Sequence, residues 1–140
     1  MVSIKNYADS LLKLKSKFSA NLISFEGLNS PEEIYKNIDC LIHYPLDKEP
    51  FGRVIVEAYD AGVPLITTGL GGASEIFENK INGIKVIPYD HEGLFNAIEN
   101  ISKDSLLKEY FVKNSINKSK NIQKNIEKEI EILINNKEVA

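Results

Sequence analysis

Apolar residues recur along the chain with two spacings, and each spacing predicts a different secondary structure. Short uninterrupted apolar runs predict buried strands at residues 21–25, 39–43, 65–68 and 84–87. Apolar residues three or four positions apart predict helices over about residues 4–19, from Ser30, over about 52–61, from Gly71 to about Asn79, and from Asp90 to about Ile101. The buried faces of the second and fifth of these helices are expected to carry Ile34, Ile38, Leu94, Ile98 and Ile101.

The C-terminal quarter keeps the helical spacing from Ser102 to about Asn135. Four residues near its start form one apolar patch, namely Leu106, Leu107, Tyr110 and Phe111. Four isoleucines further on form a stripe along one side of the helix, namely Ile122, Ile126, Ile130 and Ile134. The stripe is interpreted as a packing face, with contact to a membrane surface as the alternative.

Strands that alternate with helices predict an α/β fold, a parallel sheet of about four strands with helices on both faces. With 140 residues the chain is expected to form one domain, with residues 1–102 as its sheet-containing part and 103–140 as a helical extension. Parallel sheets bind ligands at the carboxyl ends of their strands. The loops over residues 44–50 and 68–72 are both predicted to leave the sheet at that edge.

Composition excludes several classes of function. The net charge of −3 and the pI near 5.5 give no electrostatic attraction to nucleic acid. The single cysteine, Cys40, excludes an intrachain disulfide and fits a reducing compartment, and no His/Cys cluster suggests a metal site. No apolar run approaches the about 20 residues of a membrane span, and the first residues resemble no signal peptide. We expect a cytoplasmic protein that at most rests on a membrane surface.

Candidate chemistry is concentrated between Glu49 and Glu57. Pro50 disfavours helical geometry at Glu49, so this carboxylate is expected in the loop, and Glu57 about a turn and a half into the next helix. The first-turn N–H groups of Gly52, Arg53 and Val54 have no partners within the helix, and together with the positive end of the helix dipole they favour a bound phosphate. The two carboxylates are suited to accept hydrogen bonds from hydroxyl groups, such as those of a sugar and a ribose.

Plainer interpretations stay open for each of these residues. Glu49 and Glu57 are equally well explained as solvated charges near a helix start, and Gly71-Gly72 as a tight turn between strand and helix. Glu75 is interpreted as a partner of the helix dipole, His43 as a structural histidine and Cys40 as a small core residue.

The order of these residues from position 39 to position 88 resembles a known family. The stretches that carry the resemblance are Asp39-x-x-Ile-His43, Glu49-Pro-Phe-Gly-Arg-Val-Ile-Val-Glu57-Ala, Ala61-Gly-Val-Pro-Leu-Ile66, Gly71-Gly-x-x-Glu75-Ile and Asn82-Gly-Ile-x-Val-x-Pro88. They resemble the C-terminal domain of GT-B glycosyltransferases, in the large retaining family often labelled glycosyl transferases group 1. The resemblance extends more loosely from about Tyr7 to Ile101 and implies a Rossmann-like sheet.

The resemblance implies a role for each candidate residue. Glu49 would be the catalytic residue, beside the donor sugar near the reacting centre. Glu57 would bind the ribose of the nucleotide. The other donor-binding residues would be Phe25, Gly27 and Leu28 near the base, Phe51, Gly52, Arg53 and Val54 at the diphosphate, and Gly71 and Gly72 in the second glycine turn.

The implied reaction is the transfer of a glycosyl group, with retained configuration, from a nucleotide sugar such as a UDP-, GDP- or ADP-sugar. The implied acceptor is a glycan or a lipid-linked molecule of unknown identity, in cell-surface glycan assembly. No metal and no cofactor are expected, because the helix dipole and basic side chains stabilise the leaving diphosphate.

The chain also departs from the family pattern. It lacks the two strand–helix segments that normally open this domain, with their glycine-rich turn and basic pair, and it lacks the N-terminal domain. We therefore expect a truncated reading frame, a split subunit or an excised piece of an enzyme, with little activity alone. The alternatives are a non-catalytic subunit that pairs with a separate N-terminal half, and a fragment of a GT-B nucleotide-sugar epimerase.

Overall fold

The structure is a computed structural model that describes residues 30–48, 50 and 52–137. The strand predicted at residues 21–25 and the helix predicted over 4–19 lie outside the described residues. The other predicted strands and helices are all present, although several of their boundaries differ from those expected.

Three parallel strands form the sheet, in the order β1 (Leu41–His43), β2 (Leu65–Thr67), β3 (Gly83–Lys85). Ile42 of β1 is paired with Ile66 of β2, and Ile66 with Ile84 of β3. The central strand β2 is completely buried, as expected of an uninterrupted apolar run in a parallel sheet covered on both faces. The predicted α/β fold with a parallel sheet is confirmed, with three strands among the described residues.

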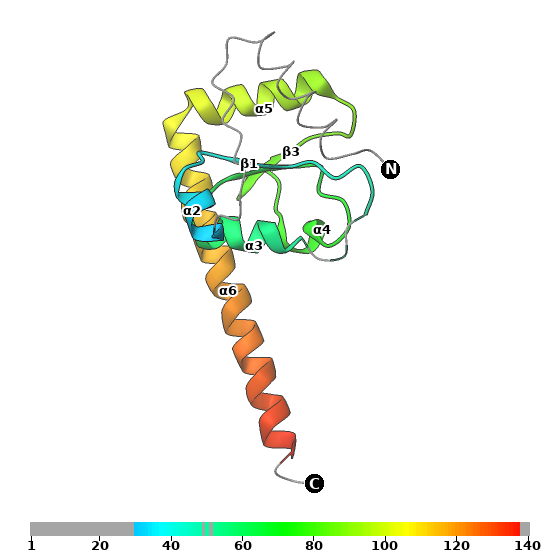
Figure 1. Ribbon diagram of the computed structural model, residues 1–140, viewed down its shortest axis with the longest axis vertical. Coiled ribbons are helices and arrows are strands. Elements are labelled where there is room, and N and C mark those ends of the chain that lie inside the picture. Colours follow the sequence, from blue (N-terminus) through cyan, green and yellow to red (C-terminus); the bar gives the residue numbers. More distant parts are fainter. Residues whose placement is uncertain (1–29, 49, 51, 138–140) are drawn as a thin grey trace.

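Helices cover both faces of this sheet (Figure 1). Helix α5 (His91–Lys103) lies over one face, and helices α3 (Arg53–Asp60) and α4 (Ala73–Ile76) lie over the other. The short helix α2 (Pro31–Lys36) packs beside α3, and the long helix α6 (Ser105–Lys137) runs past both layers.

Two of the three apolar clusters in the described part of the chain lie on opposite faces of the sheet, because successive residues of β2 point to opposite faces. Leu65 packs on the α3 and α4 side, in a cluster with Ile55, Tyr59, Ala73, Ile76 and Phe77. Ile66 packs on the α5 side, in a cluster with Val86, Ala97, Ile101 and Phe111. Phe111 belongs to α6, so the first turns of this helix are part of the core.

The predicted helix starts are confirmed where a side chain caps them. The Ser30 hydroxyl accepts a hydrogen bond from the Glu33 N–H at 3.3 Å, and the Asp90 carboxylate accepts one from the Gly93 N–H at 2.8 Å. Gly62, with a φ of 71°, follows α3, and its left-handed backbone ends the helix close to the predicted residue 61.

Two buried faces and the length of one helix differ from the sequence prediction. In α2 the buried side chain is Tyr35, while Ile34 and Ile38 are only partly buried. In α5, Ile98 is largely exposed although Ile101 is buried. Helix α4 is shorter than predicted, because the backbone becomes extended at Phe77.

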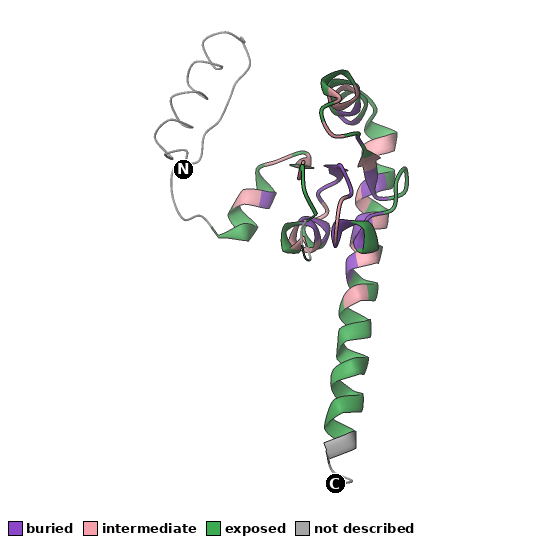
Figure 2. Cartoon of the chain, turned by 90° about the vertical axis from the view of Figure 1, so that its right-hand side faces the viewer, coloured by how far each residue is buried: buried purple, intermediate pink, exposed green. Residues whose placement is uncertain are grey.

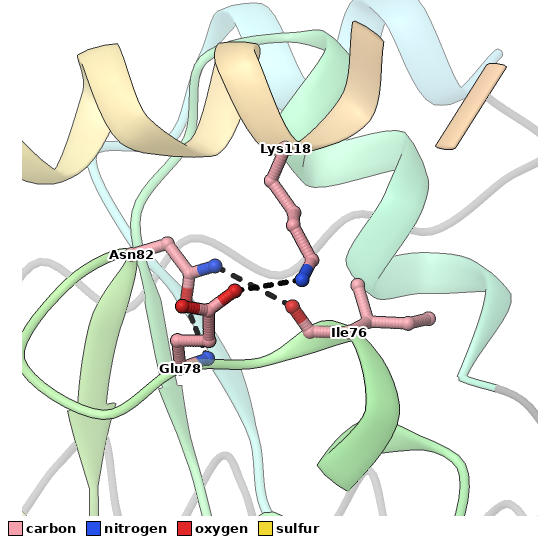
Figure 3. Close-up of polar contacts among 4 residues, drawn as sticks. All are labelled: Ile76, Glu78, Asn82 and Lys118. Atoms are coloured by element: carbon pink, nitrogen blue, oxygen red, sulfur yellow. Dashed lines mark hydrogen bonds and ion pairs between the residues drawn. The ribbon is translucent and has the colours of Figure 1, made fainter. Parts of the chain in front are cut away.

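The turn after α4 is fixed to α6 by polar contacts (Figure 3). Buried Asn82 accepts a hydrogen bond from the Glu78 N–H at 2.8 Å and donates one to the Ile76 carbonyl at 3.4 Å. The Glu78 carboxylate forms an ion pair with Lys118 of α6, with 2.7 Å between nitrogen and oxygen. The loop that leads into β3 is thereby held against the long helix.

The second half of α6 extends away from the body of the protein (Figure 2). Ser119 is the last buried residue of α6 up to residue 135, and Ile122 packs partly against the core on the α3 side. The remaining isoleucines of the predicted stripe are about half exposed, so only the first of the four packs against the described residues. No helix in the described part of the chain combines the length and the hydropathy needed to cross a bilayer.

Tyr59 provides a test of the core on the α3 side. Its side chain is completely buried, its hydroxyl has no hydrogen-bond partner among the described residues, and burial raises its pKa. A buried hydroxyl without a partner costs free energy, so we expect Tyr59→Phe to raise the free energy of unfolding by about 1 kcal/mol. Urea denaturation followed by circular dichroism measures the change, with the exposed Tyr110→Phe as an unaffected control. A destabilised Tyr59→Phe variant would contradict the expectation.

Candidate functional site

The start of helix α3 has the features of an anion site. Gly52 precedes the helix with a left-handed backbone, φ 70° and ψ 48°, and no side chain caps the helix. Position 52 favours glycine because a side chain there would force a strained conformation, and because a β-carbon would come within 3.1 Å of the Ile55 side chain. Arg53 and Val54 are exposed in the first turn, so the start of the helix is accessible from solvent.

A second glycine turn lies beside this helix start. Gly71 also has a positive φ, 69°, and Gly72 is the N-cap residue of the short helix α4, which again has no side-chain cap. A β-carbon at position 52 would lie 3.9 Å from the backbone nitrogen of Ala73. The amino-terminal ends of two helices, both following strands of the sheet, therefore converge on one place at its carboxyl edge.

Glu57 lies in the second turn of α3, with its side chain 31% exposed. One carboxylate oxygen is 3.5 Å from a guanidinium nitrogen of Arg53. The other accepts a hydrogen bond from the Tyr35 hydroxyl at 3.4 Å. The carboxylate borders a cavity of about 450 Å³ between α2 and α3, lined by Pro31, Glu32, Tyr35, Lys36, Glu57, Asp60 and Ala61.

Tyr35 is the residue of this site that the sequence analysis missed. Its ring is buried against Ala58 and Val63, and its hydroxyl also donates to the Val54 carbonyl at 3.1 Å. Burial and the nearby charge of Glu57 raise the pKa of the hydroxyl, so Tyr35 remains a hydrogen-bond donor. The available signal was that Tyr35 is the one aromatic residue of a short and mostly polar helix.

Helix α6 contacts the wall of the same cavity. Asp60, in the last turn of α3, accepts hydrogen bonds from the Ser119 hydroxyl and, at 2.9 Å, from the Gln123 side-chain amide. These two contacts connect the long helix to the helix that carries Glu57.

The Arg53 side chain is engaged in an ion pair and is not directly available to an anion at the helix start. Its side chain is 85% exposed and forms an ion pair with Glu57 one turn later in the helix. The predicted contribution of Arg53 to binding a phosphate stays a prediction, because a ligand would have to attract the guanidinium away from this carboxylate.

Some of the remaining predicted residues belong to the described part of the chain and others do not. The residues Phe25, Gly27, Leu28, Glu49 and Phe51 lie outside the described residues, so their predicted roles remain predictions. His43 lies at the end of β1 with Nδ1 3.4 Å from the Thr67 hydroxyl, as suits a structural histidine. Cys40 is partly buried, and burial raises the pKa of its thiol to about 12. Within the described residues no group of three or more His, Cys, Asp or Glu side chains is arranged to hold a metal ion.

Comparison with known proteins identifies the family. The family described as "Glycosyl transferases group 1" matches residues 5–118 of the chain. The chain belongs to this family. The predicted resemblance, which rested on the glycine, proline and glutamate pattern of residues 39–88, is confirmed.

Curated relatives of this glycosyltransferase family match most of the chain. An uncharacterized glycosyltransferase of Methanocaldococcus jannaschii is 28% identical over 113 residues, which make up 80% of this chain and 29% of the relative. The capsular polysaccharide biosynthesis glycosyltransferase CapM of Staphylococcus aureus is 30% identical over 89 residues, or 64% of this chain and 23% of the relative. The chain thus spans less than a third of the length of these two family members.

Solved structures of glycosyltransferases match the fold. Anabaena Alr3699/HepE, crystallised in complex with UDP-glucose, has a TM-score of 0.75 and 26% identity, and the match covers 85% of this chain and 33% of that structure. A glycosyltransferase from Rickettsia africae has a TM-score of 0.74 and 26% identity, and the match covers 93% of this chain and 37% of the other.

Proposed function

We propose that this chain is the donor-binding part of a glycosyltransferase and that it holds a nucleoside diphosphate sugar at the carboxyl edge of its sheet. The observation that carries the proposal is the convergence of the starts of α3 and α4, where Gly52 approaches the Ala73 nitrogen. The uncapped start of α3 presents N–H groups and the positive end of its dipole, and the glycine turn before the short α4 adds backbone N–H groups at the same place, which favours a group with several negative charges. A diphosphate has that charge.

Each part of the donor is proposed to contact a different part of the site. The amides of residues 52–54 and of the second glycine turn hold the diphosphate. Glu57, beside the cavity between α2 and α3, accepts hydrogen bonds from the ribose. Glu49 contacts the donor sugar, Phe51 contributes at the diphosphate, and the segment with Phe25, Gly27 and Leu28 lies near the base.

The proposed chemistry is transfer of the glycosyl group to an acceptor with retained configuration. As the bond to the sugar breaks, negative charge develops on the leaving diphosphate, and preoriented helix starts stabilise that charge without a metal or a cofactor. The acceptor is proposed to be a glycan or lipid-linked molecule, in cell-surface assembly at the cytoplasmic side. The assembly role is supported by the name of the Staphylococcus aureus relative.

Binding of nucleoside diphosphates to the 140-residue chain tests the proposal. We expect UDP, GDP or ADP to bind with measurable heat, and Glu57→Gln to weaken the best of these ligands about tenfold, because a charged hydrogen-bond acceptor is lost. The substitution keeps the size of the side chain and its ability to accept from Tyr35. Isothermal titration calorimetry measures both affinities.

Glu131→Gln on the exposed part of α6 is the matched control, because it makes the same change of charge far from the site. The control should bind like the wild type. No binding of any of the three nucleotides at millimolar concentration, or equal affinity of Glu57→Gln and wild type, would refute the proposal.

A second candidate function is a non-catalytic subunit that pairs with a separate polypeptide. The observation that favours it is the exposed apolar side of α6 beyond Gln123. Co-elution of the chain with the product of the adjacent reading frame in size-exclusion chromatography would support this role. Donor binding by the chain alone, without complex formation, would argue against it.

A further inference from the structure

Tyr35 connects two helices at the point where Glu57 meets the cavity. The tyrosine belongs to α2, while the two groups that its hydroxyl contacts belong to α3, 19 and 22 residues further along the chain. The hydroxyl is 3.1 Å from the Val54 carbonyl oxygen and 3.4 Å from Oε2 of Glu57. The contact therefore depends on how the two helices pack and not on helical spacing.

The Glu57 carboxylate is consequently held at both oxygens. Arg53 holds Oε1 from the same helix, and the Tyr35 hydroxyl holds Oε2 from the neighbouring helix. The one proton of the Tyr35 hydroxyl is shared between the Val54 carbonyl oxygen at 3.1 Å and Glu57 Oε2 at 3.4 Å. Together with the Arg53 contact it favours one orientation of the carboxylate, which has about four lone-pair directions and keeps capacity to accept further hydrogen bonds. The exposed Arg53 is a weak partner, because solvent screens its ion pair, whereas Tyr35 is only 8% exposed and its ring packs in the core.

We propose that Tyr35 is a positioning residue for nucleotide binding: its hydroxyl orients the Glu57 carboxylate toward the ribose of the donor. The inference rests on the proposed function, because it gives Glu57 a ligand. Preorientation improves affinity because the free protein then loses less side-chain freedom when the ligand binds. Without the hydroxyl, Glu57 keeps its charge but must be ordered by the ligand.

Packing alone does not require the hydroxyl. The ring of Tyr35 fills the space against Ala58 and Val63, and phenylalanine fills it equally well. Tyr35→Phe therefore separates the positioning role of the hydroxyl from the structural role of the ring. We expect Tyr35→Phe to fold like the wild type and to bind UDP, GDP or ADP, whichever binds best, about fivefold more weakly.

A double-mutant cycle with Glu57→Ala provides the decisive measurement. If the hydroxyl acts through Glu57, Tyr35→Phe weakens binding in the wild-type background but has no further effect in the Glu57→Ala background. A general disturbance of the helix pair would weaken binding in both backgrounds. Tyr110→Phe, which removes an exposed hydroxyl on α6, is the matched control and should bind like the wild type.

The outcomes distinguish the inference from the proposed function. Binding by the wild type that is weakened by Glu57→Ala but not by Tyr35→Phe overturns the positioning role and leaves the donor site intact. Equal weakening by Tyr35→Phe in both backgrounds also overturns the positioning role. A wild-type chain that binds none of the three nucleotides overturns both.

Discussion

Gly83→Ala is expected to lower the free energy of unfolding by about 3 kcal/mol, at the upper end of the usual cost of overpacking. A β-carbon at position 83 would lie 2.1 Å from the carbonyl oxygen of Leu65 and 2.9 Å from its carbonyl carbon. Both atoms belong to the backbone of β2, the fully buried central strand that is paired with β3 at this position. The clash cannot be relieved by rotating a side chain, so β3 has to move away from β2.

Urea denaturation followed by far-ultraviolet circular dichroism measures this loss. Gly93→Ala in α5 is the matched control, because the three atoms nearest to a β-carbon there all belong to the side chain of Asp90 and not to the backbone. The Asp90 carboxylate can rotate away, but it then loses its N-cap hydrogen bond from the Gly93 N–H. Alanine at position 93 has a higher helix propensity than glycine, so the two effects nearly cancel and the free energy of unfolding changes by no more than about 1 kcal/mol. Equal stability of Gly83→Ala and the wild type would show that the pairing of β2 and β3 differs from the one described.

Phe111→Ala is the second substitution with a large expected effect, a loss of about 4 kcal/mol in the free energy of unfolding. The ring is 1% exposed and packs on the α5 side of the sheet, against the cluster that contains Ile66 and Val86. Truncation removes a large buried side chain and leaves a cavity between α6 and the sheet. The result tests whether the first turns of α6 belong to the core of the domain.

Ile130→Ala on the same helix is the appropriate comparison, because this side chain is 50% exposed and lies beyond the packed part of α6. We expect a change within about 0.5 kcal/mol, as for most surface positions. Similar small effects of both substitutions would mean that α6 is an independent appendage.

The division into residues 1–102 and a helical extension over 103–140 stays a prediction. The position of Phe111 argues that the extension and the sheet share one core.

The strands and most helices were predictable because local sequence determines them. The run from Pro64 to Thr67 is apolar enough to be buried on both faces of a sheet, which made β2 recognisable. Ser30 and Asp90 each have a side chain that caps a helix start, and Gly62 has the backbone that ends one. The meeting of the two glycine turns at one edge was predictable as well, because the carboxyl ends of parallel strands lie together.

Contacts between helices far apart in sequence were not predictable in the same way. In a helix of six residues the apolar spacing does not decide which side is buried: the spacing of Ile34 and Ile38 predicts an inward face, but Tyr35 is the buried side chain. The hydrogen bond from Tyr35 to Glu57 depends on the packing of α2 against α3. The direction of Arg53 also depended on the structure, since the same guanidinium can face a ligand or a carboxylate one turn away.

The projecting half of α6 has a practical consequence for measurements of size. Residues 124–137 add about 20 Å of helix at 1.5 Å per residue, with no other described part of the chain packed around them. A molecule with such a protrusion tumbles and diffuses more slowly than a compact protein of 15.7 kDa, and it leaves a size-exclusion column earlier. Elution volume alone will therefore overstate the molecular mass, and a monomer will resemble a larger species unless light scattering gives the mass directly.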